Sequence, residues 1–173
     1  VKSHFPSRTL AISKNNFDFF IEKEIHQQPE VFLNNFQNRV NFNSKEIDFS
    51  NELEGLDLDE IKRINLFGMG TSYYACLLAS YWLEQISKIP TQCHNASEFT
   101  YRNPLVEENT LAISVSQSGE TADTLSAANL IKEMKIPQIA ITNTNNSELE
   151  KITKNYINIG AKTEVGVAST KTF

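Results

Sequence analysis

The chain has 173 residues, of which 40% are apolar, and a formal net charge of -5. This apolar share is enough for a folded core and excludes an intrinsically disordered chain. No apolar run approaches the roughly 20 residues that span a bilayer. The acidic balance, without a long basic stripe, argues against nucleic acid or an anionic membrane as the main partner. Because Cys76 and Cys93 lack metal-type spacing, we expect no metal or other cofactor and a reduced, cytoplasmic setting.

The first part of the chain is predicted to be a linker followed by helices. Residues 1–16 are polar and show no periodic pattern, which is typical of a linker. Apolar residues then recur at helical spacing from Phe17 to Val40. Because Pro fits best in the first turn of a helix, Pro29 divides this stretch into two predicted helices, 17–27 and 29–40, hinged near Gln28 and Pro29.

After a polar, acidic segment at 41–57, strand and helix patterns alternate along the rest of the chain. Short apolar runs between turn residues are typical of buried parallel strands, and longer runs with helical spacing are typical of helices. Trp82, at helical spacing from Leu78, is predicted to be a core residue. The predicted strands are 61–67, 91–95, 110–115, 138–142 and 156–159, and the predicted helices are 72–89, 121–135 and a short one that begins at Ser147.

This alternation predicts an α/β fold, in which a doubly wound, five-stranded parallel sheet is flanked by helices on both faces. Ligands of such sheets bind beyond the carboxyl ends of the strands, near the point where the strand order reverses. The loops at that edge are predicted at 68–72, 95–99, 116–121, 143–147 and 160–169. Asn143, Asn145 and Asn146 in the fourth loop are interpreted as turn formers.

The loop at 68–72, with the sequence GMGTS, begins like a dinucleotide-binding fingerprint and does not complete it. The third glycine position holds Tyr73, and no acidic residue ends the next strand, where Gln92, Cys93 and His94 stand. Two interpretations stay open. The loop is either a tight turn capped by Thr71 or Ser72, or a place where amides and two hydroxyls approach a ligand.

The loop at 116–121, with the sequence SQSGET, is the strongest candidate for an anion site. It precedes a helix N-terminus, whose unpaired N–H groups and dipole attract anions. Ser116, Ser118 and Thr121 add hydroxyl donors, and Gly119 permits a tight wrap. A P-loop is excluded because no Gly-Lys-Ser/Thr follows, and a serine-hydrolase elbow is excluded because Gly-x-Ser-x-Gly is absent. Capping alone needs one or two hydroxyls, so we favour a phosphate held by amides and hydroxyls.

The segment at 160–171, with the sequence GAKTEVGVASTK, is small, hydroxylated and punctuated by glycine. It is either a flexible loop or a loop that closes over a sugar through backbone groups of Val167 and Ala168 together with Ser169. His94, at the end of a strand, is interpreted as a packed or solvated histidine and not as a catalytic one.

Four motifs in this order resemble the first sugar isomerase (SIS) domain of the glutamine–fructose-6-phosphate aminotransferase, or glucosamine-6-phosphate synthase, family. They are GTS at 70–72, ASEFxYR at 96–102, SQSGETADT at 116–124 and TEVGVASTK at 163–171. KEIxxQP at 23–29 is similar to the helical segment that leads into that domain. The resemblance implies a linker at 1–16, a helical segment and loop at 17–57, and a SIS domain at 58–173. It also implies that the chain is part of a longer polypeptide.

By motif match, the resemblance implies a hexose 6-phosphate partner, either fructose 6-phosphate or glucosamine 6-phosphate, and a homodimer. Ser116, Gln117, Ser118 and Thr121 would hold the phosphate, and the sugar side would be lined by Thr71, Ser72, Val167, Ala168 and Ser169. The family's base, its lysine and its ring-opening histidine lie in a second SIS domain and tail beyond Phe173, and its glutaminase cysteine lies before Val1. We therefore expect no catalytic residue in this chain and no turnover by it alone.

Two other functions remain open at this point. An isomerase or deaminase of amino-sugar phosphates has the same fold and does not need a glutaminase domain. A regulatory module that senses a sugar phosphate would bind the same ligand and would stand beside a DNA-binding domain. The polypeptide before Val1 would distinguish the three.

Overall fold

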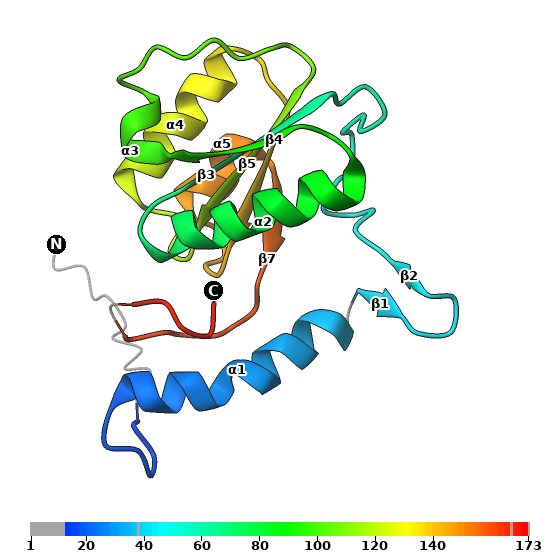
Figure 1. The fold of residues 1–173 in the computed structure, drawn as a ribbon. Helices are drawn as coiled ribbons and strands as arrows, with labels where there is room; N and C mark the ends of the chain where they lie inside the picture. Colours follow the sequence, from blue (N-terminus) through cyan, green and yellow to red (C-terminus); the bar gives the residue numbers. More distant parts are fainter. Residues whose placement is uncertain (1–12, 38, 167, 173) are drawn as a thin grey trace, which may run out of the picture.

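The computed structural model describes residues 13–37, 39–166 and 168–172 of the chain. A sheet with helices on both faces forms the main body, and a long helix, α1, lies beside that body (Figure 1). Helix α1 spans Phe20–Gln37, and a small antiparallel hairpin follows, with β1 at Val40–Asn41 and β2 at Glu46–Ile47.

The main sheet has five parallel strands in the order β4-β3-β5-β6-β7, which confirms the predicted fold class. The strands are β3 (Arg63–Gly68), β4 (Thr91–Asn95), β5 (Thr110–Ser116), β6 (Gln138–Thr142) and β7 (Asn155–Asn158). The helices of the main body are α2 (Thr71–Ser87), α3 (Ala96–Phe99), α4 (Ala122–Glu133) and α5 (Glu148–Thr153).

Alternating side chains of β3 contribute to the cores on the two faces of the sheet, as the pleat of a strand requires. Leu66 belongs to the cluster that includes Cys76 of α2. Phe67, the next residue, belongs to the cluster that includes Phe99 of α3 and Ala127 of α4. The sheet is therefore covered on both sides, with α2 on one face and α3 and α4 on the other.

Helix α1 corrects the predicted division at Pro29, because it is continuous from Phe20 to Gln37 with Pro29 inside it. Proline removes one backbone donor from a helix interior. The helix is supported on both sides of Pro29 by contacts to the end of the chain: Gln28 donates to the Thr170 carbonyl at 2.8 Å, and Asn35 donates to the Ile159 carbonyl at 2.5 Å. These long-range contacts override the local preference for a break.

The prediction that Trp82 is a core residue is wrong. Its side chain is 57% exposed, and Leu78, one turn earlier, is 40% exposed. Helical spacing placed the two residues on one face of α2 correctly, but it could not say which face is buried. The buried face carries Cys76 and Ser80. Trp82 instead borders an apolar cavity of about 590 Å³ between α2 and the sheet.

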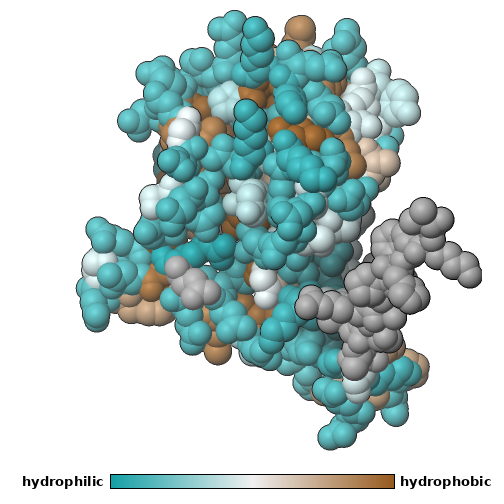
Figure 2. Space-filling view, turned by 180° about the vertical axis from the view of Figure 1, so that it is seen from behind, coloured by the Kyte–Doolittle hydropathy of each residue, from teal (hydrophilic) through white to brown (hydrophobic). Residues whose placement is uncertain are grey.

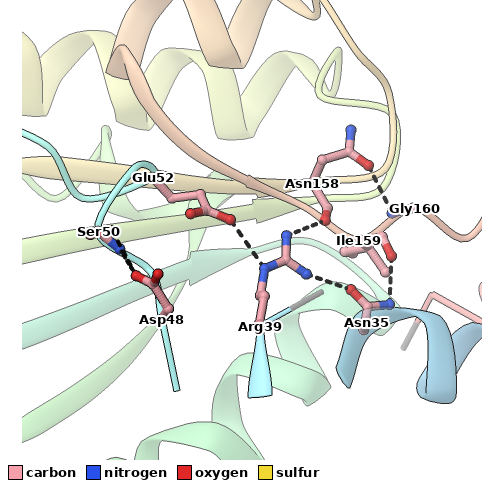
Figure 3. A network of polar contacts seen from close by, with 8 residues as sticks. All are labelled: Asn35, Arg39, Asp48, Ser50, Glu52, Asn158, Ile159 and Gly160. Atoms are coloured by element: carbon pink, nitrogen blue, oxygen red, sulfur yellow. Dashed lines mark hydrogen bonds and ion pairs between the residues drawn. The ribbon is translucent and has the colours of Figure 1, made fainter. Parts of the chain in front are cut away.

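The segment at 41–57 was predicted only as a polar connection, yet it contains most of the β1–β2 hairpin, which begins at Val40. It also contains Glu52, which forms an ion pair with Arg39. The guanidinium of Arg39 contacts the Glu52 carboxylate at 3.1 Å and donates to Asn35 Oδ1 and to the Asn158 carbonyl, both at 2.9 Å (Figure 3). This network joins the end of α1 to β7 and to the acidic segment.

Seen from behind, the surface of the main body is mostly hydrophilic (Figure 2). Among the residues that the structure describes, none of the helices is both long and apolar enough to cross a membrane.

Candidate functional site

The strand order reverses between β3 and β5, which are neighbours in the sheet. Helix α2 follows β3 and leads to the edge strand β4, whereas α4 follows β5 and leads the other way, to β6. Because the two connections diverge, a crevice is expected between them at the carboxyl ends of the strands. The predicted loops 68–72 and 116–121 both start from this edge.

The hydroxyls of loop 116–121 hold the loop in a defined shape. Ser116 Oγ accepts the Gly119 N–H at 3.1 Å and hydrogen-bonds to Thr121 Oγ1 at 3.0 Å, and Ser118 Oγ accepts the Glu120 N–H at 3.1 Å. Gly119 has a φ of +67°, which favours glycine. The hydroxyl of Ser118 accepts a bond and keeps its own proton to donate outward.

Helix α4 begins without a side-chain cap. Its N-cap residue is Thr121, whose hydroxyl makes no capping bond, because it hydrogen-bonds to Ser116. Helix α2 is similar, since its N-cap is Gly70. By contrast, Ser147 caps α5 and Asn95 caps α3. Among the four helices of the main body, the two that start where the strand order reverses are thus the two without a side-chain cap. The first-turn N–H groups of α4 therefore remain available to an anion, whereas in α2 the Tyr73 N–H already donates to the Gly70 carbonyl at 3.1 Å.

Thr71 and Ser72 occupy the first turn of α2 and are partly buried. The interpretation that one of them caps this helix is wrong, because the cap position is Gly70, one residue earlier. The alternative, that the two hydroxyls approach a ligand, stays a prediction.

Glu120 could repel an anion at this helix terminus, but its carboxylate is bound elsewhere. Glu120 Oε1 accepts the N–H of Glu148 at 2.8 Å, at the start of α5. There the carboxylate is favourably placed, because the N-terminus of a helix carries partial positive charge.

The predicted sugar-side residues of the third loop are placed in part. Ala168 is exposed and Ser169 is partly buried, while Val167 lies outside the described residues. Ser169 Oγ donates to Glu164 Oε2 at 2.8 Å and lies 2.6 Å from Thr172 Oγ1. The segment is therefore not a free loop, since its own side chains fold it around Glu164.

Glu164 is the centre of this fold. Its carboxylate also accepts the N–H groups of Thr170 at 2.7 Å and Lys171 at 3.0 Å. Burial raises the pKa of Glu164, but the bonds from Thr172, Thr170, Ser169 and Lys171 together lower it more, so the net pKa lies below its usual value. Glu164 is thus held in its charged form and is a weak base.

Asn143 connects the loop 116–121 to the segment after β7. Its backbone N–H donates to the Gln117 carbonyl at 3.0 Å. Its side chain accepts the Ala161 N–H and donates to the Lys162 carbonyl, both at 2.7 Å. The sequence analysis interpreted Asn143 only as a turn former and missed this bridge. Its position directly after a strand, at the edge where the other loops gather, is the signal that could have indicated it.

His94 is packed against aromatic residues, which agrees with one of the two interpretations given above. Its ring stacks on Phe67 with 5.4 Å between centroids and lies 5.2 Å from that of Phe99. Burial, with a smaller contribution from Arg102, lowers the pKa of His94. Within the described ranges, no group of three or more His, Cys, Asp or Glu residues is arranged to hold a metal ion.

Comparison with known proteins identifies the family of this fold. The family model described as "SIS domain" matches residues 57–173, more than half of the chain. The chain belongs to the SIS domain family. This SIS domain is 41% identical over 165 residues to the glutamine–fructose-6-phosphate aminotransferase (isomerizing) of Chlamydia trachomatis, which covers 94% of this chain and 27% of the relative. The chain therefore spans about a quarter of that relative's length.

Solved structures agree with the sequence comparison. The C-terminal domain of glucosamine-fructose-6-phosphate aminotransferase from Francisella tularensis aligns with a TM-score of 0.84 at 36% identity, over 93% of this chain and 45% of that one. A glucosamine-6-phosphate deaminase from Thermotoga maritima aligns with a TM-score of 0.70 at 28% identity, over 89% and 44%. The predicted resemblance to the aminotransferase family is confirmed.

Proposed function

We propose that this SIS domain holds a hexose 6-phosphate for a synthase that converts fructose 6-phosphate and glutamine to glucosamine 6-phosphate and glutamate. The observation that carries the proposal is the N-terminus of α4, which lacks a side-chain cap at the point where the strand order reverses. The similarity to aminotransferases over 94% of the chain supports the choice of substrate.

In this proposal, the phosphate sits at the start of α4. It accepts hydrogen bonds from first-turn amides and from hydroxyls of Ser116, Ser118 and Thr121, and Gln117 completes the loop. Because the loop contains no lysine or arginine, recognition depends on neutral donors and on the helix dipole. The binding of Glu120 to α5 supports this arrangement, since it draws a negative charge away from the phosphate.

The sugar extends from the phosphate toward α2 and the segment after β7. Thr71 and Ser72 would contact it from the first turn of α2, and Ala168 and Ser169, with Val167, from the other side. The segment 168–172 approaches α2, since Thr172 and Ala75 line the same apolar cavity.

The residues proposed to bind the ligand do not include a base. Moving a proton between adjacent carbons, as aldose–ketose isomerisation requires, needs a general acid or base near the sugar. The proposed contacts are hydroxyls, amides and an alanine, and Glu164 is occupied by hydrogen bonds that lower its pKa. We therefore assign binding to this chain and the proton transfer to other parts of a longer protein.

The structural similarity to a glucosamine-6-phosphate deaminase supports a second candidate, an amino-sugar-phosphate isomerase or deaminase. A module that senses a sugar phosphate is a third. All three bind the same ligand and differ in what accompanies the domain. A glutaminase domain encoded before Val1 would favour the synthase, and a DNA-binding domain would favour the sensor.

Calorimetry with three ligands tests the proposal. Glucosamine 6-phosphate and inorganic phosphate are expected to bind, and glucosamine is expected to bind much more weakly, because the phosphate supplies most of the contacts. No glucosamine 6-phosphate should form when the chain is incubated with fructose 6-phosphate and an ammonia source. Equal binding of glucosamine and its 6-phosphate would refute the phosphate site, and product formation would refute the assignment of binding without turnover.

A further inference from the structure

Helix α1 runs alongside the segment 158–166 in the opposite chain direction, and the chain then turns back (Figure 1). Going backward from Arg39, which follows α1, into the helix, the side chains meet successively later residues of the segment. Arg39 contacts the Asn158 carbonyl, Asn35 the Ile159 carbonyl, Glu30 the Lys162 ammonium and Glu24 the amides of Val165 and Gly166. The helix therefore lies against this segment over most of its length.

Glu24 is the most buried charged residue of this contact, with only 2% of its surface exposed. Glu24 Oε1 accepts the Val165 N–H at 2.5 Å, and its two oxygens lie 3.2 and 3.1 Å from the Gly166 nitrogen. A buried carboxylate without partners is strongly unfavourable. The carboxylate of Glu24 therefore keeps the amides of Val165 and Gly166 at this position.

Gly166 passes so close to Glu24 that a larger residue would require the carboxylate to move. A Cβ built on Gly166 would lie 2.6 Å from Glu24 Oε2. Ala168 and Ser169, two of the proposed sugar contacts, follow within three residues. The path of the chain into these two residues is therefore set at Gly166 by a side chain of α1.

The returning part of the segment is fixed to the same face of α1. The buried ammonium of Lys171 donates to Gln27 Oε1 at 3.0 Å and to the Thr163 carbonyl at 2.7 Å. The carboxylates of Glu24 and Glu164 both act favourably on its charge. Glu24 thus acts on the chain before and after Ala168 and Ser169, through hydrogen bonds to Val165 and Gly166 and through its charge on Lys171.

We propose that Glu24 is a positioning residue for sugar recognition, which holds Val165 and Gly166 and thereby places Ala168 and Ser169 relative to the loop 116–121, without touching the ligand. The proposal rests on the function proposed above and extends it. It places part of the sugar specificity on α1, outside residues 57–173, which the SIS family model matches.

The hydrogen bonds from the Val165 and Gly166 amides to Glu24, called the brace below, can be measured without any ligand. In the unchanged protein, the amides of Val165 and Gly166 should exchange slowly with deuterium, and in a Glu24→Gln variant they should exchange faster. Glutamine has the same shape but turns one acceptor oxygen into a donor and removes the charge that faces Lys171. Equal protection in both proteins would overturn the proposal.

Binding then tests the positioning role. Glu24→Gln should weaken the binding of glucosamine 6-phosphate by roughly tenfold, the effect expected if about a tenth of the variant holds Ala168 and Ser169 in the binding arrangement. It should leave the binding of inorganic phosphate unchanged. Glu22→Gln is the matched control, because it makes the same change at an exposed position of α1. A purely structural role would lower both affinities together and would overturn the proposal, as would unchanged affinity for glucosamine 6-phosphate.

Gly166→Ala provides a second variant, and Glu24→Ala combined with it removes the overlapping carboxylate. Because the overlap is then absent, the double variant should lose no more affinity for glucosamine 6-phosphate than the sum of the losses in Gly166→Ala and Glu24→Ala. A loss larger than this sum would overturn the proposed contact. If the unchanged protein bound neither phosphate ligand, the proposed function would fail, whereas amide exchange would still report on the brace.

Discussion

The hydroxyls of Thr121 and Ser116 hydrogen-bond to each other at 3.0 Å, which turns the N-cap side chain of α4 back onto the end of β5. A threonine in this position usually caps its own helix. Here the pair closes the loop and leaves the first-turn amides to another acceptor. For this reason we propose the start of α4 as the phosphate site.

Removing two hydroxyls of this loop should weaken phosphate binding. A Ser118→Ala, Thr121→Val variant should lose about 0.5–1.5 kcal/mol for each neutral hydrogen bond to the ligand, measured by calorimetry with inorganic phosphate. Ser126→Ala, on an exposed position of α4, is the control. Unchanged affinity in the double variant would place the phosphate elsewhere.

Gly119→Ala should destabilise the fold more than Gly160→Ala does. Both residues have nearly the same positive φ, +67° and +66°, so each substitution should cost about 1–2 kcal/mol in backbone strain. A Cβ at Gly119 would also overlap the Ser147 side chain, whereas one at Gly160 has nothing within 4 Å. Urea denaturation of the two variants measures the difference, and equal losses would show that the loop can move away from α5.

Arg39→Lys should loosen the junction of α1 with β7. The guanidinium of Arg39 makes three contacts in different directions, which an ammonium cannot reproduce. We expect a loss of about 1–3 kcal/mol in the free energy of unfolding. Arg63→Lys is the control, since Arg63 pairs only with the exposed Glu107, and it should cost much less. Similar losses in the two variants would contradict the role given to this network.

Glu164 should make the stability of the protein depend on pH in the acid range. The folded-state pKa of Glu164 lies below its usual value of 4.5. Its contribution is therefore complete above that value and is lost as the pH falls through the lower, folded-state pKa. The difference in unfolding free energy between the unchanged protein and Glu164→Gln should shrink as the pH is lowered below 4.5. A difference that stays constant over this range would show that Glu164 is not held in its charged form.

Local patterns predicted the main body well. Strands 91–95 and 138–142 occur at the predicted residues, and the short helix after β6 is capped by Ser147 as expected. These elements are bounded by turn and cap residues, so their limits depend on nearby sequence. Right-handed connections account for the helices on both faces of the sheet, whereas the position of the strand-order reversal, between β3 and β5, comes from the structure.

The features that the sequence did not predict depend on contacts between distant residues. The continuity of α1 through Pro29 is supported by the contact of Gln28 with Thr170. The exposure of Trp82 was not predicted, because helical spacing does not indicate which face of α2 is buried. Glu24 lies seven residues before Val31, on the same buried side of α1. A carboxylate on an otherwise buried helical face was the available signal, but its partners, Val165 and Gly166, are more than 140 residues away.

An NMR titration of the ¹⁵N-labelled protein with glucosamine 6-phosphate tests the central claim most directly. The account predicts that the largest shifts occur at the amides of Gly119, Thr121 and Ala122, at the start of α4, and that the capped start of α5 at Glu148 responds less. Shifts concentrated elsewhere, such as around Arg39 and Asn158 between α1 and β7, with the start of α4 unaffected, would contradict it.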